Sequence, residues 1–134
     1  MEKAKGTSNF HGVGRRKSSV ARVWLKPGKG EFVVNKRNSN EYFTTEITRK
    51  DIKIPFDVSG LNGKFDVLVN VVGGGVCSQA GAVRLGVARA LLSSDESLRK
   101  IFRRSDLLTV DSRVKERKKP GQKGARAKFQ FVKR

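Results

Sequence analysis

Residues 64–72 read KFDVLVNVV, and they run through the triple glycine 73–75 into residues 78–92, SQAGAVRLGVARALL. In the first stretch apolar residues fill every second position, while Leu68 and Val72 make the opposite face partly apolar, which predicts a strand in the middle of a sheet. The glycines break that strand. At 100° per residue, the second stretch collects its apolar side chains on one wide arc, so we expect the main helix there.

Weaker patterns on both sides of this unit complete a small α+β domain. Further strands are predicted at 19–25, 31–35 and 107–110, the first two joined as a hairpin by a turn over 26–30. Short helices are predicted near 40–43 and near 49–51, and Pro55 should end the second of them. Another helix is predicted from Asp95 or Glu96 to Arg104. We therefore expect a mixed four-stranded sheet with helices packed on one face.

The composition indicates a polyanionic partner. The 134 residues include 30 Lys and Arg against 12 Asp and Glu, a net charge of +18, and 37% of them are hydrophobic. Such self-repulsion favours binding to nucleic acid or, as a second choice, to an anionic membrane surface. The chain has no apolar run long enough to span a membrane, no second cysteine to pair with Cys77 and no signal-peptide pattern. We expect a soluble, intracellular protein without a membrane partner.

The charge is distributed unevenly, and a boundary at Val110 separates two parts. Residues 111–134 carry ten basic and two acidic residues, and residues 1–110 carry 20 basic and ten acidic residues. The tail lacks an apolar period, so free in water it should be disordered, and a solvated terminus is one interpretation. Its interleaved cations and aromatics, KFQF at 128–131, suit a strand of RNA instead. We divide the chain into an N-terminal extension (1–11), an RNA-binding domain (12–110) and an extended basic tail (111–134).

A second basic segment, GRRKSS at 14–19, stands just before the predicted strand 19–25. Its three consecutive cations, Arg15, Arg16 and Lys17, could follow a curved phosphate backbone, and a plain basic loop explains them equally well. Together with the basic tail, the nucleic-acid interpretation is favoured.

The sequence predicts no catalytic, metal or cofactor site. The triple glycine 73–75 lacks the third glycine of a dinucleotide-binding fingerprint and is not followed by GK[ST], and Gly12-x-Gly14 fails for the same reason. His11 and Cys77 are the single histidine and the single cysteine, so they cannot build a ligand cluster. We expect that the protein is not an enzyme; phosphate-substrate binding at 73–75 is the weakest alternative.

Five motifs follow one another in an order that matches a single protein family. They are GRRKSSVARV at 14–23, GKFDVLVNV with the triple glycine at 63–75, QAGAVR with ARAL at 79–91, DSRVKERKK at 111–119, and the terminal Lys133-Arg134. Together they resemble the ninth small-subunit ribosomal protein family, bacterial type, over roughly residues 12–134. Val132 departs from the commoner family pattern, which has serine before the final pair.

This resemblance implies an α+β domain of the type shared with the second domain of the fifth small-subunit protein. It also implies a cytoplasmic, ribosomal protein that binds small-subunit ribosomal RNA in the head, among neighbouring head proteins. The family's tail threads through RNA to the anticodon stem-loop of peptidyl-site transfer RNA, where Lys133 and Arg134 would be the contacts. The implied ribosomal-RNA contacts are Arg15, Arg16, Lys17, Arg113, Lys115, Arg117, Lys118, Lys119, Lys123, Arg126 and Lys128.

A different class of protein shares the same charge pattern. A free-standing RNA chaperone or a nucleoid-type basic protein would also carry a basic tail, because phosphate neutralisation needs no defined order of residues. Such a protein should tolerate shuffling of the tail and should act outside ribosomes.

Overall fold

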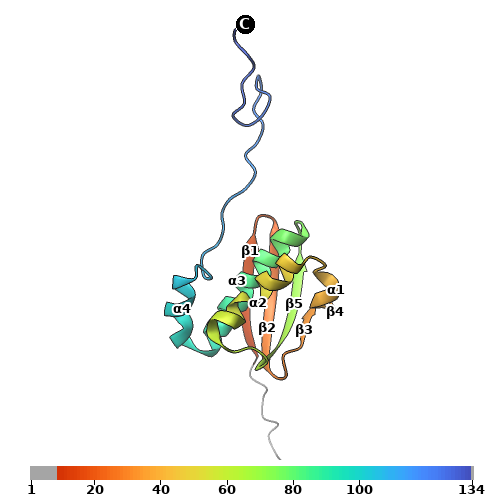
Figure 1. The fold of residues 1–134 in the computed structure, drawn as a ribbon, viewed down its shortest axis with the longest axis vertical. Coiled ribbons are helices and arrows are strands. Elements are labelled where there is room, and N and C mark those ends of the chain that lie inside the picture. The colour runs from red at the N-terminus through yellow and green to blue at the C-terminus, as the bar shows by residue number, and fades with distance from the viewer. Residues whose placement is uncertain (1–8, 134) are drawn as a thin grey trace, which may run out of the picture.

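The computed structural model describes residues 9–133 and places a mixed sheet at the centre of the domain. Over these residues the sheet has five strands in the order β1-β2-β5-β3-β4, drawn in Figure 1. The strands are β1 (Phe10–Arg16), β2 (Ser19–Pro27), β3 (Phe32–Val34), β4 (Arg37–Asn38) and β5 (Phe65–Val72). Because β5 pairs antiparallel with β2 and parallel with β3, its predicted central place is confirmed.

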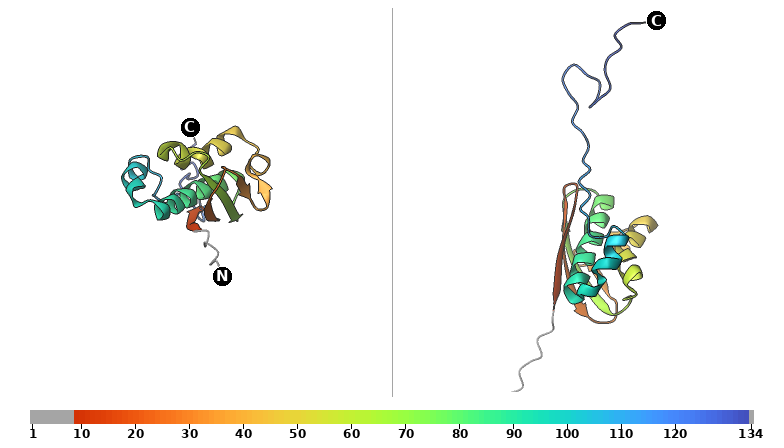
Figure 2. Two further views of the ribbon diagram at one scale, coloured as in Figure 1. Left: turned by 90° about the horizontal axis from the view of Figure 1, so that it is seen from below. Right: turned by 90° about the vertical axis from the view of Figure 1, so that its left-hand side faces the viewer.

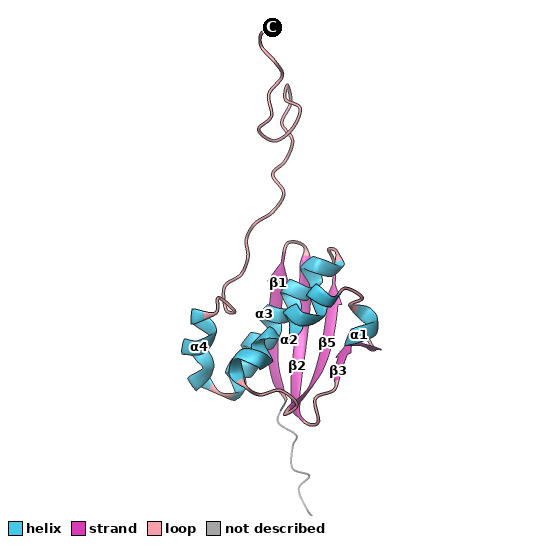
Figure 3. Cartoon of the chain, in the orientation of Figure 1, coloured by secondary structure: helices cyan, strands magenta, loops and turns pink. Residues whose placement is uncertain are grey.

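Helices cover one face of the sheet, which confirms the predicted α+β class. They are α1 (Ser39–Tyr42), α2 (Glu46–Ser59), α3 (Val76–Ser94) and α4 (Arg99–Arg104), with a 3-10 turn, η1 (Glu96–Leu98), before α4. The edge-on view of Figure 2 shows these helices on one side and an uncovered sheet face on the other. In Figure 3, α3 lies along the sheet behind α2.

The hydrophobic core lies between α3 and the inward face of the strands. Alternate residues of β2 and β5 are buried there, namely Ala21, Val23, Leu25, Val67, Val69 and Val71. The predicted apolar arc of α3 is buried as expected, including Val83, Val87 and Leu91. The side chain of Arg84 reaches from the same helix to Asp51 of α2 and forms an ion pair of 3.7 Å, so it links the two helices.

Glycines let β1 lie directly against the backbone of α3. A Cβ on Gly14 would lie 1.8 Å from the carbonyl oxygen of Ala82, and one on Gly12 would lie 2.3 Å from that of Gly86. Arg89 of α3 donates a hydrogen bond of 2.8 Å to the carbonyl oxygen of Val13. The sequence does not predict β1, because two glycines weaken the strand pattern locally while their reason lies in a distant helix.

The strand count differs from the expectation of four. The predicted strands 19–25, 31–35 and 64–72 correspond to β2, β3 and β5, and the structure adds β1 and the short β4. The predicted strand at 107–110 is wrong: the Leu107 N–H donates to the carbonyl oxygen of Phe102 at 3.0 Å, and its side chain is buried against the end of α4. Residues 108–109 form a bend, and the segment has no ladder partner among the described strands.

The expectation that Pro55 ends a helix is also wrong. α2 runs through it to Ser59, and Pro55 is buried together with Ile52 and Phe56. A proline inside a helix costs about 3 kcal/mol through its missing N–H and its ring. Burying large apolar side chains recovers roughly 1.5–3 kcal/mol each, so the packing of this face keeps the helix continuous.

Beyond Leu107, the last buried core residue of the described part, the chain leaves the domain. Residues 111–133 run away from it without a helix or a strand of the sheet, as Figure 1 shows. None of the helices in residues 9–133 is long and apolar enough to cross a membrane.

Candidate nucleic-acid interface

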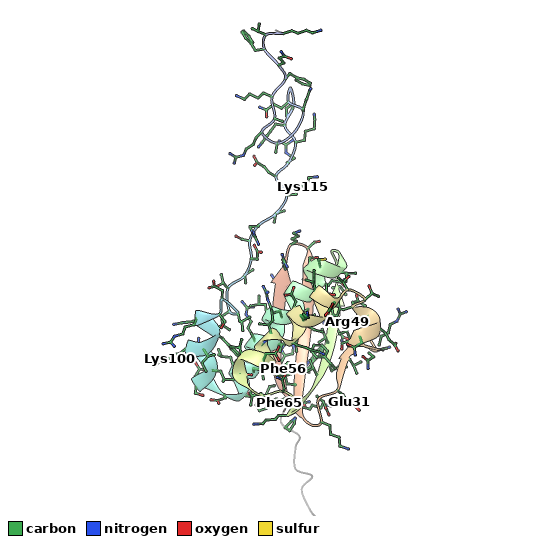
Figure 4. The ribbon with its side chains drawn as sticks, in the orientation of Figure 1. Glu31, Arg49, Phe56, Phe65, Lys100 and Lys115 are labelled. Atoms are coloured by element: carbon green, nitrogen blue, oxygen red, sulfur yellow. The ribbon has the colours of Figure 1, made fainter. Side chains whose placement is uncertain are left out.

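The tail leaves the domain beside the turn between β1 and β2, where the two segments enclose a groove of about 370 Å³. We call it the root groove; its lining residues are Arg16, Lys17, Asp111, Arg113, Val114 and Lys115. Four predicted ribosomal-RNA contacts from two distant parts of the sequence therefore meet at one place. Figure 4 shows Lys115 on the tail just beyond the domain.

Asp111 organises the cations of the root groove. Its carboxylate accepts two hydrogen bonds from the Arg113 guanidinium, at 3.0 and 2.8 Å, and it pairs with Arg16 at 3.8 Å. The hydrogen bonds from the Arg113 side chain and backbone N–H, with Arg16 further away, hold the pKa of Asp111 well below its usual range. The carboxylate stays ionised at neutral pH, so the groove has four cations against one anion. Such a surplus suits a phosphate.

Arg16 is held in the groove by a glycine of α3. A Cβ on Gly81 would lie 2.4 Å from Cδ of Arg16, so a bare backbone at this position makes room for the arginine side chain. The Nε of Arg16 is buried and has no hydrogen-bond partner among the described residues. This Nε is the atom that faces the Asp111 carboxylate at 3.8 Å, so an ion pair offsets its burial in place of a hydrogen bond.

The three cations of the GRRKSS segment do not act as one patch. Arg16 points to the helix side, as its contact with Gly81 shows, and Lys17 forms the turn with a φ of 52°. Arg15 is exposed and lies at the alternate position of β1, on the uncovered face of the sheet. The structure therefore joins two of the three to the tail and separates Arg15 from them.

Further along the tail, Glu116 closes a small loop. It pairs with Lys119 and, at 2.9 Å, with Arg126. Lys119 also donates to the carbonyl oxygen of Ala125 at 3.1 Å, and the backbone of Lys123 bonds to Ala127 at 3.0 Å. Hydrogen bonds from Lys119 and Arg126 lower the pKa of Glu116. Both acids of the tail thus hold neighbouring cations in position.

Most of the predicted contacts on the tail are exposed to solvent. Within residues 9–133, Lys115, Arg117, Lys118, Lys123, Lys128 and Lys133 are exposed and form no ion pair with a carboxylate. Phe129 and Phe131 are 59% and 100% exposed, and Lys123 lies 5.7 Å from the ring centre of Phe129. Exposed cations beside exposed aromatic rings are typical of RNA-binding segments. Arg134, the second predicted transfer-RNA contact, lies outside the described residues.

The triple glycine 73–75 serves as a strand-to-helix turn. Gly73 and Gly74 have φ angles of 78° and 62°, which favour glycine. The hydroxyl of Ser19 donates to the carbonyl oxygen of Gly73 at 2.9 Å and lies 2.7 Å from that of Ser78, so hydroxyl groups of the chain fill the turn. Over the described part of the chain, no three His, Cys, Asp or Glu side chains gather as a metal site.

Comparisons with known proteins show the family of this chain. The profile of a family described as "Ribosomal protein S9/S16" matches residues 14–134. A protein of Mycoplasma mobile, named small ribosomal subunit protein uS9, is 54% identical over 93% of this chain and 96% of its own length. Proteins of the same name from Syntrophobacter fumaroxidans and Mycoplasmopsis synoviae are 50% and 53% identical over similar shares, 96% and 95% of their lengths. The family comprises structural, non-enzymatic ribosomal components, and this chain belongs to it.

Proposed function

We propose that this chain binds small-subunit ribosomal RNA in the head of the subunit and carries its tail to the anticodon stem-loop of peptidyl-site transfer RNA. The observation that supports this most directly is the root groove, where Arg16 and Lys17 of the domain meet Arg113 and Lys115 of the tail. A phosphate bound there would touch the domain and the tail together, and would fix the direction in which the tail leaves.

The tail suits a path between crowded RNA strands. Its exposed cations neutralise phosphates and release counterions, which supplies most of the affinity of a polycation for RNA. Contacts to phosphates position a protein without reading sequence, so we expect recognition of RNA shape and backbone. In this role the protein works in the cytoplasm as a ribosomal component, beside other proteins of the subunit head.

Deletion of Lys133 and Arg134 tests the transfer-RNA contact. Each exposed cation contributes on the order of 1 kcal/mol or less, so ribosomes with the shortened chain should bind peptidyl-site transfer RNA roughly three- to thirty-fold more weakly. Filter binding of transfer RNA to purified small subunits measures this. Assembly of the subunits should be intact, because the root groove and the rest of the tail remain.

A matched control removes two exposed cations far from the tail. Lys29 and Lys64 are exposed and lie next to the paired ends Pro27 and Phe65 of β2 and β5, opposite the β1–β2 turn where the tail leaves. Their double substitution, Lys29→Gln with Lys64→Gln, removes the same charge. This variant should leave transfer-RNA affinity unchanged. If the deletion of Lys133 and Arg134 also leaves the affinity unchanged, the transfer-RNA contact is refuted. If the deletion and the Lys29/Lys64 variant lose the same affinity, the loss is an effect of net charge.

A further inference from the structure

The sheet face away from the helices forms a second surface that the proposed function does not use. We call it the open face; its residues are His11, Val13 and Arg15 of β1, Val20, Arg22, Trp24 and Lys26 of β2, Val33 of β3, and Asp66, Leu68, Asn70 and Val72 of β5. They alternate with the buried positions of the same strands, so they point away from the core. In Figure 2 none of the described helices covers this side.

An aromatic and apolar row crosses the open face. His11 is the register partner of Trp24, Trp24 that of Leu68, and Leu68 that of Val33. The rings of His11 and Trp24 lie 5.1 Å apart at an angle of 53°. Leu68 is 44% exposed, although an apolar side chain in a sheet is normally covered. A groove of about 190 Å³ runs along the row and includes Trp24, Val33 and Leu68 in its lining.

The basic residues on one side of this row suit a polyanion. Arg22 is two residues before Trp24 on the same face of β2, and Asn70 of β5 is its register partner. Arg15 of β1 lies two residues further from the row on this face, opposite Val20. Both arginines are exposed. On the row's other side, Lys26 and two acids, Glu31 and Asp66, line the groove. Glu31 is exposed, whereas Asp66 is engaged locally. Its Oδ1 accepts N–H bonds from Lys29, Gly30 and Glu31 at 2.9, 3.0 and 3.0 Å, and these bonds, that of Glu31 first, lower its pKa.

RNA fits this combination better than an apolar protein surface does. Unpaired bases stack on aromatic side chains, and their phosphates pair with nearby arginines. An apolar partner would cover the row but would also take Arg22 out of water without a counter-charge, which is costly. The arrangement therefore favours a ligand with flat apolar rings and regularly spaced negative charges.

We propose that the open face binds an unpaired segment of ribosomal RNA, with one base stacked on Trp24 beside His11 and phosphates at Arg22 and Arg15. The proposal rests on the proposed RNA-binding function and adds a contact on the domain that is independent of the tail. It gives Arg15, which the structure separates from the root groove, a place in a second site.

Trp24 is the single tryptophan of the chain, so its fluorescence reports on this face without any substitution. Full-length protein is titrated with a 12-nucleotide single-stranded RNA of adenosine and cytidine that carries a dye, and with an RNA duplex of 12 base pairs. Anisotropy of the dye measures total binding, and Trp24 emission measures occupation of the open face. We expect the single strand to quench Trp24 strongly as it saturates the protein, and the duplex, whose bases are stacked, to leave the emission nearly unchanged.

Two substitutions with one control complete the test. Trp24→Val keeps a residue suited to a strand, and Arg22→Gln removes one exposed charge; each should weaken binding of the single strand about five- to twenty-fold. Lys100→Gln removes one exposed charge from α4, on the helix side (Figure 4), and should change binding less than two-fold. Thermal unfolding of each variant checks the fold.

The outcomes separate this proposal from the function on which it rests. RNA that binds by anisotropy while Trp24 emission stays constant would overturn the open-face site and leave the tail function standing. Absence of binding by both readouts would overturn the RNA-binding function itself. Emission that responds to another protein of the subunit head but not to RNA would make the open face a protein interface and refute the proposal.

Discussion

Replacing Gly14 with alanine should lower the thermal unfolding midpoint of the protein by roughly 10–20 °C. The new Cβ would lie 1.8 Å from the carbonyl oxygen of Ala82 and 2.5 Å from the backbone nitrogen of Gly86. Both atoms belong to the backbone of α3, which cannot rotate away as a flexible side chain can. β1 and α3 must therefore separate, and the overpacking should cost about 2–3 kcal/mol of the free energy of unfolding. Circular dichroism during heating measures the midpoint.

Gly75→Ser is the matched control for this prediction. A Cβ on Gly75 meets nothing within 4 Å, and its φ of −101° is open to any residue. Serine is also a preferred residue at the start of a helix, where Gly75 stands. The unfolding midpoint of this variant should lie within a few degrees of that of the parent chain. Its free energy of unfolding should differ by about 1 kcal/mol or less. A Gly14→Ala protein as stable as the Gly75→Ser protein would contradict the close packing of β1 on α3.

Ending the chain after Val110 should abolish most RNA affinity while leaving the domain folded. The truncation removes ten of the 30 cations and two of the 12 acids, so the net charge falls from +18 to +10. Proteins that contact six to ten phosphates lose about 10³–10⁵ in affinity between 50 and 200 mM salt, and each lost contact reduces the salt slope by about 0.7–0.9. We expect at least a hundred-fold weaker binding to small-subunit ribosomal RNA and a salt slope smaller by several units.

The chain that ends after Val110 should keep the thermal stability of the domain. The last buried core residue of the described part is Leu107, so the tail adds nothing to the core, and the unfolding midpoint should shift by only a few degrees. A chain whose residues 112–132 are shuffled at constant composition is the control. It should keep affinity for RNA but fail to support peptidyl-site binding in small subunits. Full function of the shuffled chain would favour the free-standing chaperone, and a truncated chain with full affinity would refute the role of the tail.

Patterns local in sequence predict the centre of this fold. Residues 64–72 are apolar on both faces because β5 lies between β2 and β3. The apolar side of the helix predicted over 78–92 is buried against the sheet. The alternation in 19–25 also places Arg22 and Trp24 on one face of β2, as the burial pattern of the strand confirms. Each of these features depends on burial with a period of two or 3.6 residues, which a single segment reveals by itself.

Features that depend on contacts between distant segments are the ones that the sequence does not reveal. Gly12 and Gly14 look like a loose segment, and only the backbone of α3 explains them. Pro55 looks like a helix end until its burial with Ile52 and Phe56 is known. The root groove is similar: the cations of 15–17 and 113–115 are recognisable separately, but their meeting depends on where the tail leaves the domain.

Directed hydroxyl-radical probing tests most directly whether the domain sits on ribosomal RNA and the tail reaches transfer RNA. Cys77 is the single cysteine and is exposed, so Cys77→Ser followed by Phe131→Cys gives one attachment point for an iron chelate on the tail. Ile47→Cys gives a second on α2, where the side chain is 71% exposed. In reconstituted small subunits with peptidyl-site transfer RNA, iron at 131 should cleave the anticodon stem-loop, and iron at 47 should cleave only ribosomal RNA of the head. Transfer RNA left intact by iron at 131, or cut equally from both positions, would contradict this account.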